Sequence, residues 1–416
     1  MKLCIYEDQG YGSLYPATYL RPVYDLRCGF SSLKEKIISC HPDLHITLHC
    51  REDISKLLSE NCKHPVNKFE DDDYLFINGR VLYNSKLDEK IDLTKLDFLY
   101  FSENTVAAAV ISAANINRIS EVKDTPLQLK EIFPEFISIE VEADLIDYPW
   151  DLIYKNSDSI VNDFRSMVLK PVIKGRIDNG VYFVNENDIY IAETAVVKPG
   201  VVIDAEEGPV YIDDGVRIMP NAVIQGPAYI GKQTLIKAGA RISGGTSIGD
   251  TCKVGGEIDS TIIQGYSNKQ HDGFLGHSYL GEWVNIGADT NNSDLKNNYS
   301  SIKVIQNGRQ VDTGKTFFGM IMGDHSKTGI NTMFNTGTIV GSFCNIFGSD
   351  FPPKFIPSFT WGGKNSFQEY DLNKALETAK IVMSRRNLEL SAEYECLISR
   401  LYRNTADDRA SFKKQI

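Results

Sequence analysis

Histidine side chains in the second half of the chain are the first candidates for chemistry. His271, His277 and His325 are three of the 7 histidines, and His271 lies in the charged, glycine-containing run Asn268-Lys269-Gln270-His271-Asp272-Gly273. Such a run predicts an exposed loop. A histidine there can accept a proton from an attacking amine or hydroxyl near neutral pH. The alternative interpretation is an ordinary surface histidine.

Cysteine spacing predicts neither a zinc site nor a disulfide framework. The 8 cysteines are scattered, and none forms a C-x-x-C pair or lies at ligand spacing from a histidine. We therefore expect reduced, mostly buried thiols. A catalytic cysteine stays open as an alternative, without supporting geometry.

Branched aliphatic residues recur at a strict period of six in the middle of the chain. The uninterrupted series is Ile212, Ile218, Ile224, Ile230, Ile236, Ile242, Ile248 and Val254. Neither an α-helix nor an ordinary strand has this period, whereas a triangular solenoid does, with one hexapeptide for each side. The repeat predicts a left-handed parallel β-helix over residues 176–350, a scaffold characteristic of acyltransferases. Further hits at Phe274, Leu280, Ile286 and Met322 predict that the solenoid continues past two interruptions.

These interruptions are where we expect function, because binding residues concentrate in loops held by a rigid scaffold. The first spans about Asp259 to Gly273 and contains His271, and the second spans about Asn291 to Phe317.

The flanking segments predict three further units. Residues 1–146 alternate short apolar runs with helical stretches, which favours a Rossmann-like α/β domain. Residues 147–175 are predicted to form a linker helix. Residues 351–416 are expected to form a C-terminal helical extension, which packs against the solenoid or a neighbouring subunit.

Composition favours small-molecule chemistry. The formal net charge is -11, with 24% of residues charged. This acidic balance argues against nucleic-acid and anionic-membrane partners, which require clustered Lys and Arg. No uninterrupted apolar run approaches 18 residues, and the N-terminus lacks a signal-peptide pattern. We expect a cytoplasmic protein.

Specific motifs in the second half resemble a known family. The runs His271-Asp272-Gly273-Phe274-Leu275-Gly276 and Val284-Asn285-Ile286-Gly287-Ala288, with Asn298-Tyr299, resemble the acetyltransferase half of bacterial bifunctional GlmU enzymes. The run Gly323-Asp324-His325-Ser326-Lys327-Thr328-Gly329-Ile330-Asn331 resembles a GlmU-like sugar nucleotidyltransferase family more closely still. The resemblance implies a nucleotidyltransferase domain followed by a glucosamine-1-phosphate N-acetyltransferase β-helix, with acetyl-CoA and UTP as substrates.

Carried over to this sequence, the resemblance assigns site residues. It makes His271 the general base that deprotonates the sugar amine, and it places Asn285, Asn298, Tyr299 and, with a two-residue difference in spacing, Glu257 near the amino sugar or acyl group. Hydrogen bonding within the solenoid is the alternative role for Asn285, Asn298 and Tyr299. Lys269 and Lys296 are candidate phosphate partners on charge alone, with a solvated loop lysine as the alternative. Phe274 stands where the family has a tyrosine, so a hydroxyl that could bind the substrate phosphate is lost. The identity of the substrate is therefore less well defined than the type of reaction.

The N-terminal domain matches the resemblance less well. Its first loop, Tyr6 to Pro16, is a weak match to the family's glycine-rich phosphate loop, although the segment after it makes Arg21 and Arg27 candidate nucleotide contacts. Arg80 stands where the family has an aspartate that binds the catalytic Mg²⁺. Either Asp71, Asp72 or Asp73 replaces that ligand, or another carboxylate does, or the domain binds a nucleotide sugar without making one.

Three interpretations follow. The first, which we favour, is acetyl transfer in the β-helix coupled to a retained or altered nucleotidyl transfer. The second is a γ-type carbonic anhydrase, which would require histidines converging on a metal between subunits. The third is a non-catalytic module that binds a nucleotide sugar. Because such β-helices usually form trimers, we expect a homotrimer with sites between subunits.

Overall fold

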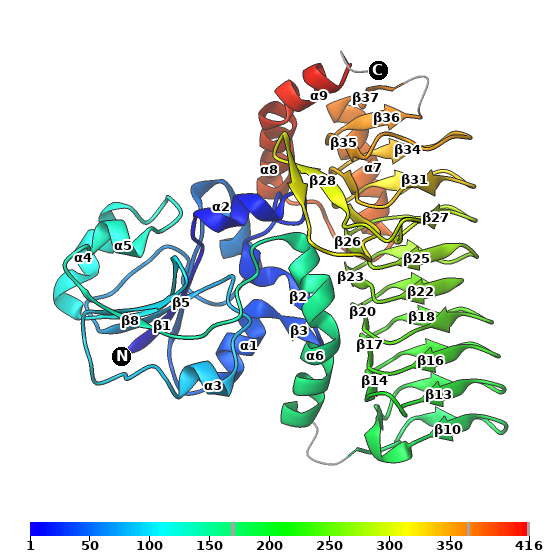
Figure 1. Ribbon diagram of the computed structural model, residues 1–416, viewed down its shortest axis with the longest axis horizontal. Helices are drawn as coiled ribbons and strands as arrows, with labels where there is room; N and C mark the ends of the chain where they lie inside the picture. The colour runs from blue at the N-terminus through cyan, green and yellow to red at the C-terminus, as the bar shows by residue number, and fades with distance from the viewer. Residues whose placement is uncertain (168–170, 364–366, 414–416) are drawn as a thin grey trace.

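Two units lie side by side in the computed structural model, an α/β domain and a long solenoid, with helices at one end of the solenoid (Figure 1). The structure describes residues 1–167, 171–363 and 367–413. This arrangement confirms the predicted fold class, an N-terminal Rossmann-like domain followed by a parallel hexapeptide solenoid and C-terminal helices.

The N-terminal domain is built on a six-stranded mixed sheet. Its strand order is β4 (Ile46–His49), β1 (Lys2–Tyr6), β5 (Tyr74–Asn78), β7 (Thr105–Ile111), β6 (Phe98–Ser102) and β8 (Ile137–Glu140). β1 pairs in parallel with β4 and β5, and β7 runs antiparallel to both its neighbours. The strands β1 and β5 are almost wholly buried, as expected for apolar runs covered on both faces.

Short helices and a two-stranded ribbon complete this domain. They are α1 (Leu33–Cys40), α2 (Glu52–Asn61), α3 (Ser85–Asp88), α4 (Ile116–Glu121), α5 (Leu129–Ile132), the 3₁₀ turns Gln9–Leu14, Val23–Asp25 and Ala113–Asn115, and β2 (Arg27–Cys28) with β3 (Ser31–Ser32). A capping box between Ser32 and Glu35 begins α1, because both side chains satisfy free backbone N–H groups there.

The solenoid has three parallel faces, and every residue of the uninterrupted aliphatic series from Ile212 to Val254 is buried in its interior. One face is the nine-stranded sheet β11 (Ile189–Ile191), β14 (Val210–Ile212), β17 (Ala228–Ile230), β20 (Thr246–Ile248), β23 (Ile262–Gly265), β26 (Tyr279–Glu282), β30 (Met320–Met322), β33 (Thr338–Val340) and β35 (Phe355–Ile356). The ladder therefore continues past the predicted end at residue 350.

The second and third faces follow the same order. The second contains β10 (Tyr182–Val184), β13 (Val202–Asp204), β16 (Val223–Gln225), β19 (Arg241–Ile242), β22 (Glu257–Asp259) and β25 (Phe274–Gly276), with β27 (Asn291–Asn292) and β32 (Met333–Phe334). The third contains β9 (Arg176–Ile177), β12 (Val196–Val197), β15 (Arg217–Ile218), β18 (Leu235–Ile236), β21 (Lys253–Val254) and β24 (Asn268–Lys269), then β31 (Lys327–Thr328), β34 (Asn345–Ile346), β36 (Thr360–Gly362) and β37 (Gln368–Glu369). A 3₁₀ turn, Glu186–Asp188, precedes β11.

The two predicted interruptions differ in kind. Residues 259–273 are not an excursion, because β23 and β24 keep the parallel register there; the coils are shortened at their corners instead. This shift places Leu275, rather than the predicted Phe274, in the interior opposite Ile258. The second interruption is a true excursion, which carries the antiparallel hairpin β28 (Lys303–Gln306) and β29 (Arg309–Asp312).

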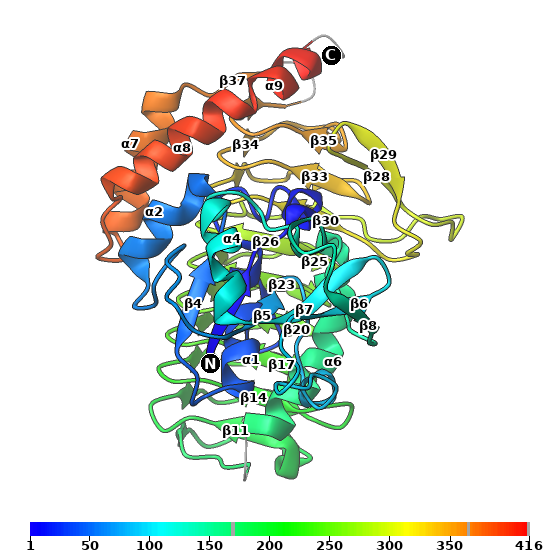
Figure 2. The ribbon, with the colours of Figure 1, turned by 90° about the vertical axis from the view of Figure 1, so that its left-hand side faces the viewer.

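Helices join the two units. The helix α6 (Pro149–Met167) lies in the predicted linker and runs along the solenoid, where Asn156 Nδ2 donates to the carbonyl of Gly245 at 2.7 Å. At the other end, α7 (Leu372–Ser384), α8 (Ala392–Asn404) and α9 (Ala406–Lys413) follow the last coils, and α8 lies beside α2 (Figure 2). Among the described residues, no helix combines the length and the apolar composition that a membrane span requires.

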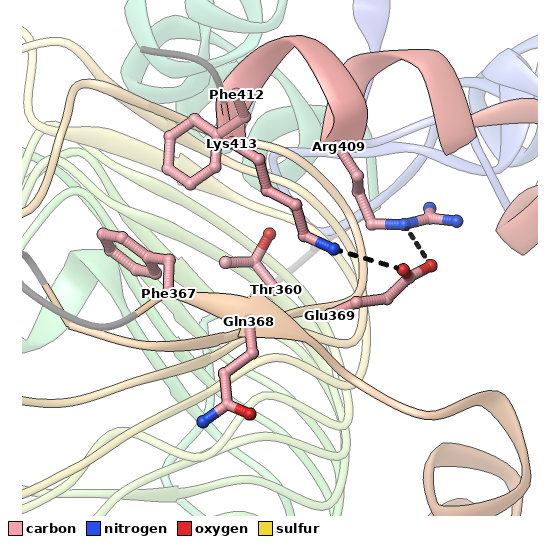
Figure 3. A pocket seen from close by; sticks show the side chains of 7 residues that line it. All are labelled: Thr360, Phe367, Gln368, Glu369, Arg409, Phe412 and Lys413. Carbon is pink, nitrogen blue, oxygen red and sulfur yellow. Dashed lines mark hydrogen bonds and ion pairs between the residues drawn. The ribbon is translucent and has the colours of Figure 1, made fainter. Parts of the chain in front are cut away.

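The last coil is closed by α9. Arg409 and Lys413 both point to the carboxylate of Glu369 on β37, at 2.9 and 3.5 Å, and Phe412 packs against Phe367 (Figure 3). These side chains surround a small cavity between α9 and β37. We interpret the packing of α9 here as a cap on the apolar interior of the solenoid.

Candidate active site

His271 lies exposed at the solenoid corner that follows β24, as the sequence predicted for its loop. It shares a groove of about 330 Å³ with Asn285. The other residues that line this groove are Gln270, Ile286, Gly287, Ala288, Thr328, Gly329 and Ile330. The groove therefore presents an imidazole and an amide beside an aliphatic wall, which suits a substrate with an apolar arm.

Lys269 is buried within the solenoid rather than exposed to solvent. It occupies the interior column, opposite Val254, where the preceding coils carry Ile or Val. Its ammonium group donates to the carbonyl oxygens of Gly255 at 3.0 Å and His271 at 2.8 Å. Burial lowers the pKa of Lys269 to about 8, because desolvation disfavours the charged form. Lys269 therefore anchors the backbone of the His271 corner, and its predicted contact with substrate is not supported by this position.

The remaining predicted substrate residues lie on other parts of the surface. Glu257, on β22, forms an ion pair with Arg241 at 2.9 Å. Asn298 and Tyr299 lie in the exposed loop before β28, where Asn298 Oδ1 accepts hydrogen bonds from Ser300. Tyr299 is 69% exposed. The structure thus brings His271 and Asn285 together, and it does not place Glu257, Asn298 or Tyr299 in their groove.

The other two solenoid histidines are already engaged. His277 Nδ1 lies 2.9 Å from Asp294 Oδ2, and its ring stacks on Phe317. His325 is buried, and its Nε2 lies 3.1 Å from the hydroxyl of Tyr394 on α8. Burial keeps the pKa of His325 well below its usual range. The three histidines therefore do not converge on one point within the chain.

A second region of interest is the carboxyl edge of the N-terminal sheet, where open α/β sheets bind ligands. β1 ends before Asp8 and β5 ends before Arg80. The Arg80 guanidinium donates to both oxygens of Asp8, at 2.8 and 2.7 Å, and it also contacts Asp147. Gly10 is required beneath it, because a Cβ there would lie 2.2 Å from Arg80 Nε.

The donor set at this edge does not fit a Mg²⁺ ion. The carboxylate of Asp8 is held by Arg80, and the described residues contain no group of three or more His, Cys, Asp or Glu that could hold a metal. Asp71, Asp72 and Asp73 precede β5, whereas Arg80 follows it. The three aspartates therefore lie at the opposite end of this strand, roughly 15 Å from Arg80. The hypothesis that one of them replaces the missing ligand is therefore wrong.

The loop after β1 is also held from the other side. The tip of the β28–β29 hairpin reaches it, and Gln306 Nε2 donates to the carbonyl oxygens of Ser13 at 3.0 Å and Tyr15 at 2.7 Å. Asn307 Nδ2 donates to Gly12 at 2.8 Å. A segment inserted in the solenoid thus contacts the position of the family's phosphate loop.

Arg21 and Arg27 lie between the two units. Arg21 Nη2 lies 2.8 Å from Asp324 Oδ1 and 3.1 Å from Glu282 Oε2, both on the solenoid. The Arg27 guanidinium stacks over the ring of Tyr229 at 5.3 Å, and its backbone N–H donates to Gln264. Both arginines thus contact residues of the solenoid. These contacts do not support the predicted role of Arg21 and Arg27 in nucleotide binding.

A cleft of about 1370 Å³ opens beside the same carboxyl edge. It is lined by residues that follow β5, β6 and β8, such as Tyr83, Glu103 and Glu142, and by Lys36 and Lys90. Side chains of both charges line it.

Comparison with known proteins supports both halves of this description. Residues 3–170 match the family model described as sugar nucleotidyl transferase, and residues 209–244 match the bacterial transferase hexapeptide. The chain therefore carries a sugar nucleotidyltransferase-family domain followed by transferase hexapeptide repeats, and the resemblance seen in the sequence is confirmed.

Curated relatives share this organisation at modest identity. The bifunctional protein GlmU of Methanocaldococcus jannaschii is 26% identical over 330 residues, covering 70% of this chain and 75% of its own. That of Methanococcus aeolicus is 27% identical, with 65% and 69% covered. A bifunctional sugar-1-phosphate nucleotidylyltransferase/acetyltransferase of Sulfurisphaera tokodaii is 29% identical, with 50% and 46% covered. A solved UDP-N-acetylglucosamine acyltransferase from Campylobacter jejuni covers 55% of this chain and 94% of its own at 15% identity, but its TM-score of 0.18 supports no inference.

Proposed function

We propose that the solenoid transfers an acetyl group from acetyl-CoA to the amine of an amino sugar 1-phosphate such as glucosamine-1-phosphate. A ring nitrogen of His271 accepts the N–H proton as the amine nitrogen attacks the thioester carbonyl. The C–S bond then breaks, and coenzyme A leaves as the thiol after taking up a proton. The observation that carries this proposal is the groove in which exposed His271 and Asn285 lie beside an aliphatic wall.

The active assembly we propose is a homotrimer in the cytoplasm, with each groove completed by a neighbouring subunit. Ile330, which lines the groove, is 70% exposed, and Phe347, which lies beside Gly329 of the groove, is 41% exposed. Exposed apolar side chains at one edge are typical of a surface that is covered on assembly. Static light scattering tests this directly, because a monomeric mass would contradict it.

The test of the activity is release of the coenzyme A thiol with glucosamine-1-phosphate as acceptor. We expect His271→Ala to lose activity by a factor of about 10² to 10⁴, the range for removal of a general base. His45→Ala, an exposed histidine of the N-terminal domain, is the matched control and should retain full activity. Absence of thiol release by the native protein would overturn the acceptor assignment, and an active His271→Ala would overturn the base.

For the N-terminal domain a second candidate function is favoured over nucleotidyl transfer. We infer that it binds a nucleotide sugar, with UDP-N-acetylglucosamine as the first ligand to test, in the cleft lined by Tyr83 and Lys90. The Asp8–Arg80 pair supports binding without turnover, because it occupies the position of a metal ligand. Formation of a nucleotide sugar from UTP and the sugar phosphate in a Mg²⁺-containing assay would overturn this inference.

A further inference from the structure

A second cavity, of about 250 Å³, adjoins the His271 groove. Gln270 and Asn285 line both cavities, so the two meet at these side chains. The remaining residues that line the second cavity are Lys253, Tyr266, Asn268, Trp283, Lys327, Val382, Arg385 and Arg386. It therefore lies between the outer face of the third solenoid sheet and the end of α7.

Four cationic side chains line this cavity without a carboxylate among the lining residues. Within the described ranges, Lys327 donates only to the carbonyl oxygen of His325, at 2.9 Å, and Arg386 Nη2 lies 3.4 Å from Asn268 Oδ1. Arg386 Nε is buried and has no hydrogen-bond partner in the part of the chain that the structure describes. Among the described residues, neither these two nor Lys253 and Arg385 forms an ion pair with an acid. This concentration of positive charge contrasts with the net charge of -11 for the chain.

A buried cationic group without a partner, such as Arg386 Nε, is costly unless an anion binds to it. Burial lowers the pKa of Lys327 to about 8, with no carboxylate to offset the desolvation. Guanidinium and ammonium groups together match the oxygens of a phosphate group in charge and geometry. The stacked rings of Tyr266 and Trp283, 4.5 Å apart, form an apolar wall beside them.

We propose that this cavity binds a phosphate group of a substrate whose other end extends into the His271 groove. The proposal rests on the proposed acetyl transfer, and it adds the residues that hold the substrate, namely Lys253, Lys327, Arg385 and Arg386. Two sources of phosphate fit this chemistry. One is the phosphates of coenzyme A, and the other is the phosphate of the amino sugar.

Calorimetric titration of the full-length protein distinguishes the two sources without any need for turnover. Coenzyme A and glucosamine-1-phosphate are titrated separately into the native protein, Lys327→Gln and Arg386→Gln. We expect both variants to weaken binding of one of the two ligands by about ten-fold or more, since each removes a charged hydrogen bond. Arg217→Gln is the matched control, because Arg217 lies exposed on the same sheet, outside the cavity. Thermal unfolding verifies that each variant is folded.

The ligand whose affinity falls identifies the source of the phosphate. Native affinity for both ligands in both folded variants would overturn the proposal, as would failure of the native protein to bind either ligand. The two proposals can fail separately. The phosphate cavity stands if Lys327→Gln and Arg386→Gln bind the ligand more weakly while His271→Ala binds it like the native protein. The acetyl-transfer proposal falls if the native protein nevertheless releases no thiol.

Discussion

The ammonium nitrogen of Lys269 lies 2.8 Å from the carbonyl oxygen of His271. A residue in the interior column of the solenoid thus fixes the backbone that carries the proposed base. The bond to Gly255 ties the same ammonium to the preceding coil. A charged side chain in a largely aliphatic column reduces stability, so its presence next to His271 indicates a positioning role.

Replacing Lys269 with methionine should therefore reduce catalysis more than substrate binding. We expect Lys269→Met to lower kcat for acetyl transfer about ten-fold or more with little change in KM, because the His271 corner loses its anchor. Ile236→Met, in the same interior column but remote from the corner, is the control and should retain native kcat. A native kcat for Lys269→Met would refute the positioning role.

The same lysine predicts how stability depends on pH. The pKa of Lys269 is about 8 in the folded chain and about 10.5 when unfolded, so the unfolded chain binds more protons between these values. Below pH 8 the buried ammonium is charged, and the folded chain bears the full desolvation penalty. As pH rises above 8 the group loses its proton in the folded chain, and this penalty disappears. The free energy of unfolding of the native protein, relative to Lys269→Met, should increase by up to roughly 3 kcal/mol from pH 7.5 to 10.5. Urea denaturation at several pH values measures this difference, and a flat or falling difference would contradict it.

The ion pair between Arg21 and Asp324 should hold the two units together. Arg21→Met leaves the buried Asp324 and the half-buried Glu282 without their cation, and we expect a loss of about 3 to 5 kcal/mol in the free energy of unfolding. Burial already raises the pKa of Glu282. The double variant Arg21→Met with Asp324→Asn should recover part of this loss. Denaturation of the single and double variants provides the test, and additive effects would show that the two residues do not interact.

Ligand binding by the N-terminal domain should not require a divalent cation. We expect titration of UDP-N-acetylglucosamine to give the same dissociation constant in Mg²⁺ and in EDTA, because Arg80 already neutralises Asp8 and Asp147. Tighter binding in Mg²⁺ by about ten-fold or more would show that a metal site forms and would reject this prediction. His271→Ala serves as the control, since it should bind this ligand like the native protein.

The solenoid could be predicted from the sequence because its signal is local. A period of six from Ile212 to Val254 specifies which side chains enter the interior, and all of them are buried. The prediction failed where coils shorten, since Leu275 rather than Phe274 enters the core and a one-residue shift turns a side chain to the other face. The exposed setting of His271 was predicted correctly, from charged neighbours and glycine.

The roles of individual charged residues depended on contacts between distant segments. The α/β domain, the hexapeptide solenoid and the loop that carries His271 follow from the sequence alone, because local periodicity and turn residues encode these features. The pairing of charged side chains became visible in the folded chain. Arg80 pairs with Asp8, 72 residues away, Arg21 pairs with Asp324, 303 residues away, and Arg386 Nη2 lies 3.4 Å from Asn268 Oδ1. No local pattern specifies such pairs, because the partner of a buried charge is set by how the two units pack.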